Sequence, residues 1–98
     1  MAADGNWNLV IETPMGQRQG TLSVKTQGGQ LTGSQSAEGR SIDIFDGAAN
    51  GNAVSWKVAI TDPMDMTLEF SGTVDGDQMS GSVKLGPFGD APFSGSRA

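Results

Sequence analysis

The residues of this chain that could do acid–base chemistry are three pairs of closely spaced carboxylates. Two carboxylates that flank a cleft at a suitable separation can hydrolyse a glycosidic bond. Each pair lies at or next to a predicted turn, where Asp is favoured because its side chain hydrogen-bonds the local backbone. We therefore expect no enzyme activity, and a carboxylate-based hydrolase is the weakest of three hypotheses. The pairs are Asp43 with Asp46, Asp62 with Asp65, and Asp75 with Asp77.

The 98 residues include no His and no Cys, which removes most other catalytic and metal chemistry. A nucleophile activated by His, a Cys/His zinc site, a disulfide and an iron–sulfur cluster all need one of these residue types. The segment Asp75-Gly76-Asp77 lacks the further ligands of a calcium-binding loop. Against 11 acidic residues stand 6 scattered basic ones, so no cluster of Lys and Arg serves nucleic acid. We expect no catalytic residue, no metal, no cofactor and no nucleic-acid partner.

A large apolar residue directly follows Pro in three of the predicted loops. Loop tips are usually polar, so Met15, Met64 and Phe88 call for an explanation. They either fold inward and cover the mouth of a barrel, or form an apolar rim that binds a small apolar ligand or a partner protein. Met suits such a rim because its unbranched side chain repacks against different surfaces. Met66 and Phe45 extend this predicted patch.

Apolar and polar residues alternate along most of the chain, which predicts short β-strands. Seven turn signals, among them Gly28-Gly29 and Gly76-Asp77, separate the runs at nearly even spacing and predict eight strands. No stretch shows the period of a helix or the ~20 apolar residues of a membrane span. Eight hairpin-connected strands with one apolar face close most simply into an all-β, antiparallel up-and-down (meander) barrel. A two-sheet sandwich is the alternative.

The register of the hairpins predicts an inward row of small residues next to a tryptophan. A two-residue loop at Gly76-Asp77 and the pairings of Ile60 with Leu68 and Leu85 with Ala91 set this register. A three-residue loop at Asn50-Gly51-Asn52 would place Ile44 opposite Val58 and Ile42 opposite Ile60. Either the Trp56 ring lies over the glycines and fills a narrow barrel, or the row is the floor of a ligand site. The predicted row reads Trp56, Gly72, Gly81, Gly95.

Gly5-Asn6-Trp7 at the start of the first strand and Arg97 on the last resemble the calycins, which include lipocalins, fatty-acid-binding proteins and avidins. In that superfamily a Trp and a basic residue plug the closed end of the barrel, so the resemblance implies this role for Trp7 and Arg97. Segments 31–39 and 54–58 look most like the avidin, or streptavidin-like, branch. Gln35 stands where that branch has a ligand-contacting Tyr, so biotin binding is not predicted. The chain is also similar to small bacterial barrel proteins without an assigned function.

The length predicts one domain over residues 5–98, with residues 1–4 as a disordered N-terminal segment. No secretory signal is recognised and Cys is absent, so we expect a cytoplasmic protein. The leading hypothesis is a non-enzymatic calycin-like barrel that binds a small apolar ligand or a partner protein, a second copy included, at its Met- and Phe-rich open end. The alternative is a structural barrel with a filled interior and no ligand. The residues predicted for binding are Met15, Met64, Met66, Phe88, Phe45 and Trp56.

Overall fold

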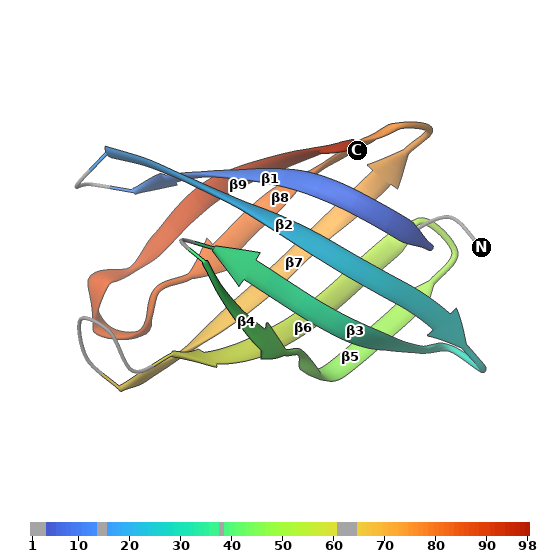
Figure 1. The fold of residues 1–98 in the computed structure, drawn as a ribbon, viewed down its shortest axis with the longest axis horizontal. Helices are drawn as coiled ribbons and strands as arrows, with labels where there is room; N and C mark the ends of the chain where they lie inside the picture. Colours follow the sequence, from blue (N-terminus) through green and yellow to red (C-terminus); the bar gives the residue numbers. More distant parts are fainter. Residues whose placement is uncertain (1–3, 14–15, 38, 61–64) are drawn as a thin grey trace.

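The computed structural model describes residues 4–13, 16–37, 39–60 and 65–98, most of which lie in antiparallel strands (Figure 1). Alternating residues supply one apolar face to each strand, as Val54, Trp56 and Val58 do. The elements are β1 (Gly5–Thr13), β2 (Gly16–Gln27), β3 (Gln30–Ala37), β4 (Arg40–Asp43), β5 (Phe45–Asn50), β6 (Ala53–Ile60), β7 (Met66–Asp75), β8 (Gln78–Lys84), the 3₁₀ turn η1 (Gly86–Phe88) and β9 (Asp90–Arg97).

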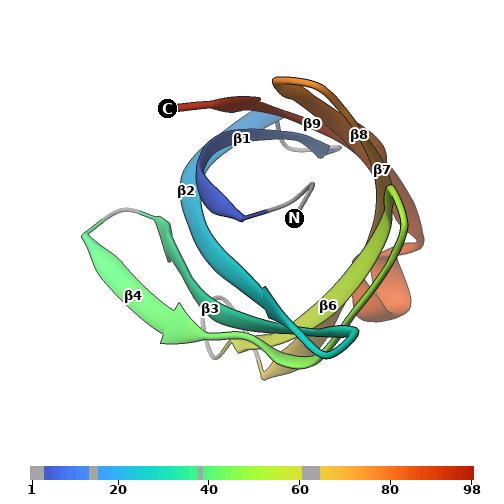
Figure 2. The same cartoon turned by 90° about the vertical axis from the view of Figure 1, so that its right-hand side faces the viewer.

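Eight of these strands close into a barrel, as the sequence predicts. Strands β1, β2, β3, β5, β6, β7, β8 and β9 each pair with the next, and β9 pairs with β1. Figure 2 shows this closed wall seen along the barrel. The fold prediction of an antiparallel up-and-down β-barrel is confirmed.

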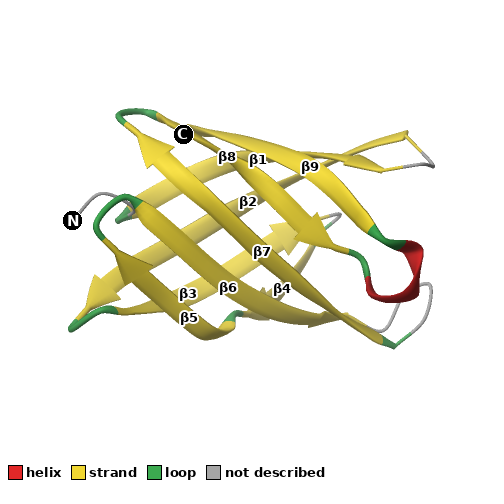
Figure 3. Ribbon diagram, turned by 180° about the vertical axis from the view of Figure 1, so that it is seen from behind, coloured by secondary structure: helices red, strands yellow, loops and turns green. Residues whose placement is uncertain are grey.

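The two ends of the barrel differ in their connections (Figures 1 and 3). At the end that we call the closed end, tight turns at Gly28-Gly29, Gly51-Asn52 and Gly76-Asp77 join the strands. At the opposite end, the open end, η1 connects β8 to β9. The other connections at the open end include residues 14–15, 38 and 61–64, which lie outside the described residues.

Residues 40–50 form two strands, β4 and β5, so the described chain has nine strands where the sequence predicts eight. A register shift between Phe45 and Ala48 interrupts the pairing of β5 with β6. Asp46 adopts a left-handed backbone with φ of 50°, the one non-glycine residue with positive φ in the described chain. Such a bulge bends a strand. As a result β5 stays in the barrel wall, while β4 pairs with β3 and swings away from β6 (Figure 2).

The turn at Gly51 is shorter than predicted. Asn50 pairs with Ala53, which leaves a two-residue turn rather than the expected three-residue loop. The bulge compensates for the missing residue, because Phe45 pairs with Lys57 in the register that the longer loop would give. The expectation that Ile42 faces Ile60 is wrong, since Ile42 pairs with Gln35 on β3.

Two other predicted pairings are wrong by two residues. Ile60 pairs with Met66 and Val83 pairs with Ala91, in place of the expected Ile60–Leu68 and Leu85–Ala91 pairs. A shift of two keeps the same side chains inside but changes their neighbours. Trp56 therefore lies opposite Phe70, not Gly72, and Gly81 lies opposite Phe93, not Gly95.

The predicted pairing of Gly72 with Gly81 is correct, but these glycines accommodate a different ring. A Cβ on Gly81 would overlap the carbonyl oxygen of Ser71, and one on Gly72 would lie 3.0 Å from Cζ of Phe93. The glycines thus allow close approach of β7 and β8 and make room for Phe93. They do not make room for Trp56.

Candidate functional site

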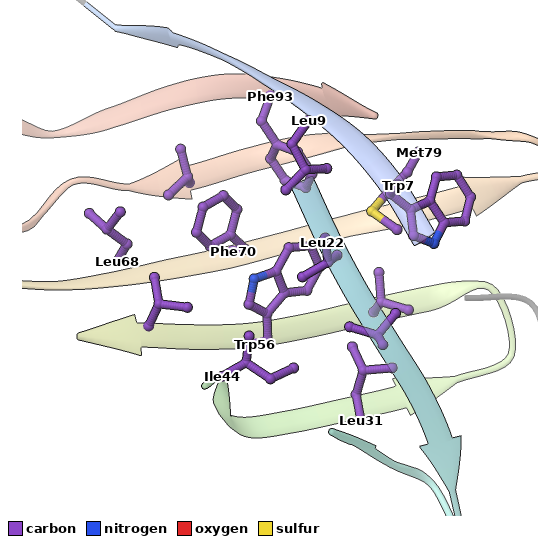
Figure 4. Close-up of a cluster of buried hydrophobic side chains, with 14 of the residues drawn as sticks. Trp7, Leu9, Leu22, Leu31, Ile44, Trp56, Leu68, Phe70, Met79 and Phe93 are labelled. Atoms are coloured by element: carbon purple, nitrogen blue, oxygen red, sulfur yellow. The ribbon is translucent and has the colours of Figure 1, made fainter. Parts of the chain in front are cut away.

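Three aromatic rings occupy the centre of the barrel (Figure 4). Trp56 stacks on Phe70 with ring centroids 4.9 Å apart, and Phe93 meets both rings edge-on. All three side chains are buried. Trp56 Nε1 donates a hydrogen bond of 3.1 Å to Oε1 of Gln35, which satisfies the indole N–H inside an apolar core. We call Trp56, Phe70 and Phe93 the aromatic centre.

A set of apolar side chains that are only partly buried lies on strands or strand ends toward the open end. Each comes from a different strand or strand terminus and packs against the core. Met66 also lies beside η1, since a Cβ on Gly86 would be 3.6 Å from Cβ of Met66. We call this set the mouth ring: Ile11, Ile42, Ile60, Met66 and Leu85.

The structure brings together only part of the predicted binding patch. Met66 belongs to the mouth ring, whereas Trp56 is 1% exposed and lies in the aromatic centre. Phe45 is 41% exposed and pairs with Lys57 on the outer face of the wall. Met15 and Met64 lie outside the described residues, and Phe88 is placed by its backbone as the last residue of η1.

Four members of the mouth ring were not predicted as site residues. Ile11, Ile60 and Leu85 have inward parity and stand at or near the ends of their strands at the open end. A signal for them was present, because the last inward residue before an open-end loop is covered by neighbours on one side only. Ile42 could not be found in this way, because its exposure depends on the bulge that moves β4.

At the closed end, Trp7 and Arg97 are direct partners on β1 and β9. The guanidinium carbon of Arg97 lies 4.4 Å from the centroid of the Trp7 ring, and Trp7 is 0% exposed. Arg97 Nε is also 3.2 Å from a carboxylate oxygen of Asp77, and its Nη1 donates to the backbone oxygen of Asp4. Arg97 therefore joins the first strand, the last strand and the β7–β8 turn.

Asp4, at the end of the segment expected to be disordered, makes a second contact across the closed end. Its Oδ1 accepts a hydrogen bond of 2.7 Å from the backbone N–H of Thr26. The neighbouring Thr26 hydroxyl and the hydrogen bond from the Thr26 backbone N–H, with the positive charge of Lys25 nearby, lower the pKa of Asp4 below its usual value of 3.8. Its ionised form is favoured in the folded chain.

The carboxylates considered for catalysis, as far as they belong to the described residues, lie on the outer surface. Asp46 is 3.7 Å from Nζ of Lys57, which also lies 3.8 Å from Glu69, and Asp77 pairs with Arg97. Asp62 lies outside the described residues. Within residues 4–13, 16–37, 39–60 and 65–98, no three His, Cys, Asp or Glu side chains gather as metal ligands would. The described part of the chain also has no helix with the length and apolarity to cross a bilayer.

Two shallow hollows lie over the outside of β1, β2 and β3. Their volumes are about 280 and 470 Å³, and the pair of Thr21 and Ser36 lines both. Other hydroxyl and amide side chains, such as Asn6 and Ser34, complete the lining. Neither hollow is lined by the aromatic centre or the mouth ring.

No family model, curated protein or solved structure matches the chain.

Proposed function

We propose that this chain is a non-enzymatic, calycin-like binding barrel whose mouth ring takes an apolar group of a small ligand or a partner protein. The observation that carries the proposal is the mouth ring itself. Five apolar side chains gather at one end and remain partly exposed, although each packs against a closed core. Covering such surface is favourable by about 25 cal/mol for each Å² removed from water.

The aromatic centre supports a shallow site at the mouth. Trp56, Phe70 and Phe93 are in mutual contact, so side chains occupy the middle of the barrel. A bound group would rest on the mouth ring with the aromatic centre beneath it. The alternative is a structural barrel with no ligand. It has the same filled centre and differs only in that its mouth ring binds nothing.

Two further observations support the other parts of the proposal. The cation–π pair of Trp7 and Arg97 is the contact that the calycin resemblance implies for the closed end. The ion pairs of Asp46 with Lys57 and of Asp77 with Arg97 engage exposed carboxylates away from the mouth ring, which favours a non-enzymatic role.

Binding of the apolar dye 1-anilinonaphthalene-8-sulfonate tests the mouth ring. Met66→Ser with Leu85→Ser should weaken dye binding by about tenfold or more, because tenfold corresponds to ~1.4 kcal/mol of lost contact. Val10→Ser, which removes a partly exposed apolar side chain from the outer face, is the matched control and should leave binding unchanged. Equal binding by both variants, or no dye binding by the native chain, would refute the proposal. The second result would favour the structural barrel.

A further inference from the structure

The barrel wall has a split between β4 and β6. β4 pairs with β3 through four residue pairs and, among the described residues, has no strand on its other side. β6 pairs with β5 only as far as the Phe45–Lys57 pair, so Val58–Ile60 has no ladder partner on that side in the described chain. Figure 2 shows β4 diverging from β6 toward the open end.

The split offers an added strand hydrogen-bonding groups at its edge and apolar side chains on its inner and outer sides. A strand edge presents main-chain N–H and C=O groups on which another extended segment can pair. On the inner side, Ile42 of β4 and Ile60 of β6 both belong to the mouth ring. On the outer side, the exposed ring of Phe45 marks the point where the split begins.

The bulge that produces the split contains a residue with a strained backbone. Asp46, with φ of 50°, adopts a conformation that residues with a side chain rarely take. If the register of the Phe45–Lys57 pair continued, Ile44 would face Val58 and β4 would lie along β6. Bulges and strained residues of this kind concentrate at functional sites.

From these observations we infer that the split takes an extended peptide, which adds as a short strand to β4 with its apolar side chains between Ile42 and Ile60. This inference rests on the proposed function and names the occupant of the mouth ring. The peptide carries apolar residues at alternate positions, because successive side chains of a strand point to opposite faces.

The charges around the split favour a peptide with basic flanks. β4 itself carries one acidic and one basic residue, Asp43 and Arg40, whereas Asp46 lies on the bulge and Asp65 immediately before β7. Lys57 is already within 4 Å of two carboxylates, those of Asp46 and Glu69. The chain as a whole has a net charge of −5, which steers cationic partners toward it.

Amide hydrogen exchange followed by NMR tests the inference with a defined probe, acetyl-Lys-Val-Thr-Val-Thr-Val-Lys-amide. On saturation with this peptide, protection of the amides in 40–43 and 58–60 should rise by about tenfold or more, because paired amides exchange only on opening. The same peptide with Pro in place of both Thr residues should have no effect, since Pro removes the N–H groups. Protection at another part of the chain, or none, would overturn the inference.

A disulfide lock gives an independent test, because the chain has no Cys of its own. In Asp43→Cys with Ala59→Cys, oxidation should join β4 to β6 and abolish peptide binding, which reduction should restore. Ser55→Cys with Ser71→Cys, placed on a pair within the intact wall, is the matched control and should bind in both redox states. Undiminished binding by the oxidised lock would overturn the inference. If the lock does not oxidise, the exchange experiment decides.

The two proposals fail in different ways. Dye binding at the mouth ring without protection of β4 by the peptide would remove strand addition and leave the proposed function intact. Absence of both dye and peptide binding would remove both.

Discussion

The closed and open ends of this barrel use the same strands for different purposes. At the closed end, Arg97 contacts Trp7, Asp77 and Asp4, so parts of the chain that are far apart in sequence are held together by polar contacts. At the open end, the mouth ring leaves apolar side chains partly exposed, and β4 leaves the wall. The difference teaches that the contacts that tie the wall together and the exposed apolar surface are found at opposite ends of one small barrel.

The largest expected effect comes from comparing the free energies of unfolding of Trp7→Ala and Leu85→Ala. Removing the fully buried Trp7 should lower the free energy of unfolding by about 3–5 kcal/mol, because the cavity that it leaves cannot collapse completely. Leu85 is partly exposed, so its removal should cost about 1–2 kcal/mol, below the range for buried Leu. Urea denaturation measures both values. Equal losses would show that the two ends carry the stability alike.

A smaller effect is expected when Arg97 is replaced. Arg97→Lys keeps the charge but loses the planar group that lies over Trp7 and reaches Asp77, so it should cost about 0.5–2 kcal/mol. Lys84→Arg, on an exposed position of β8, is the control and should change little. Thermal denaturation of both variants measures the difference. An unaffected melting temperature for Arg97→Lys would mean that the Trp7 contact contributes nothing.

Two substitutions that change backbone strain, Gly51→Ala at the closed end and Asp46→Gly at the bulge, should change the free energy of unfolding in opposite directions. Gly51 turns the chain at the closed end with φ of 62° and open space where a Cβ would lie, so Gly51→Ala should destabilise by about 1 kcal/mol through strain alone. Asp46→Gly relieves the left-handed residue of the bulge and should stabilise by about 0.5 kcal/mol, net of the exposed ion pair with Lys57. Chemical denaturation checks both signs. A destabilised Asp46→Gly would show that the ion pair outweighs the strain.

The smallest effect concerns pH. The folded pKa of Asp4 is lowered, so its contribution to stability is present above the unfolded value near 3.8 and is lost as pH falls through the folded pKa. The melting temperature of Asp4→Asn should therefore be slightly below that of the native chain at pH 7 and equal to it at acid pH. A difference in melting temperature that is constant across this range would contradict the role of the ionised carboxylate.

The barrel was predictable from sequence because alternation determines which side chains point inward. Trp7, Trp56 and Phe93 are inside, as their parity requires. Alternation does not determine how far each hairpin slides, because a shift of two residues keeps every side chain on its face. The misplacement of Trp56 opposite Gly72 arose in this way, and only packing against Phe70 and Phe93 distinguishes the two registers.

The candidate site was predictable only in part, for a related reason. Met66 and Leu85 follow from parity and from their places next to open-end loops. The split at β4 does not follow, because it needs a two-residue turn at Gly51 and a compensating bulge at Asp46 in the same hairpin. No local pattern distinguishes that combination from a three-residue loop without a bulge.

The pairing of β1 with β9 has a consequence for how the chain folds. The other pairings in the wall join strands that are near neighbours in sequence, whereas Asp4 and Arg97 are 93 residues apart. Closing a loop of this length costs more entropy than closing a hairpin, and distant contacts slow folding. The hairpins can form one after another, but the barrel closes only when its first and last strands, β1 and β9, pair. The pairing of β1 with β9 should therefore limit the folding rate of this chain. A circular permutant that makes β9 and β1 adjacent in sequence should fold faster.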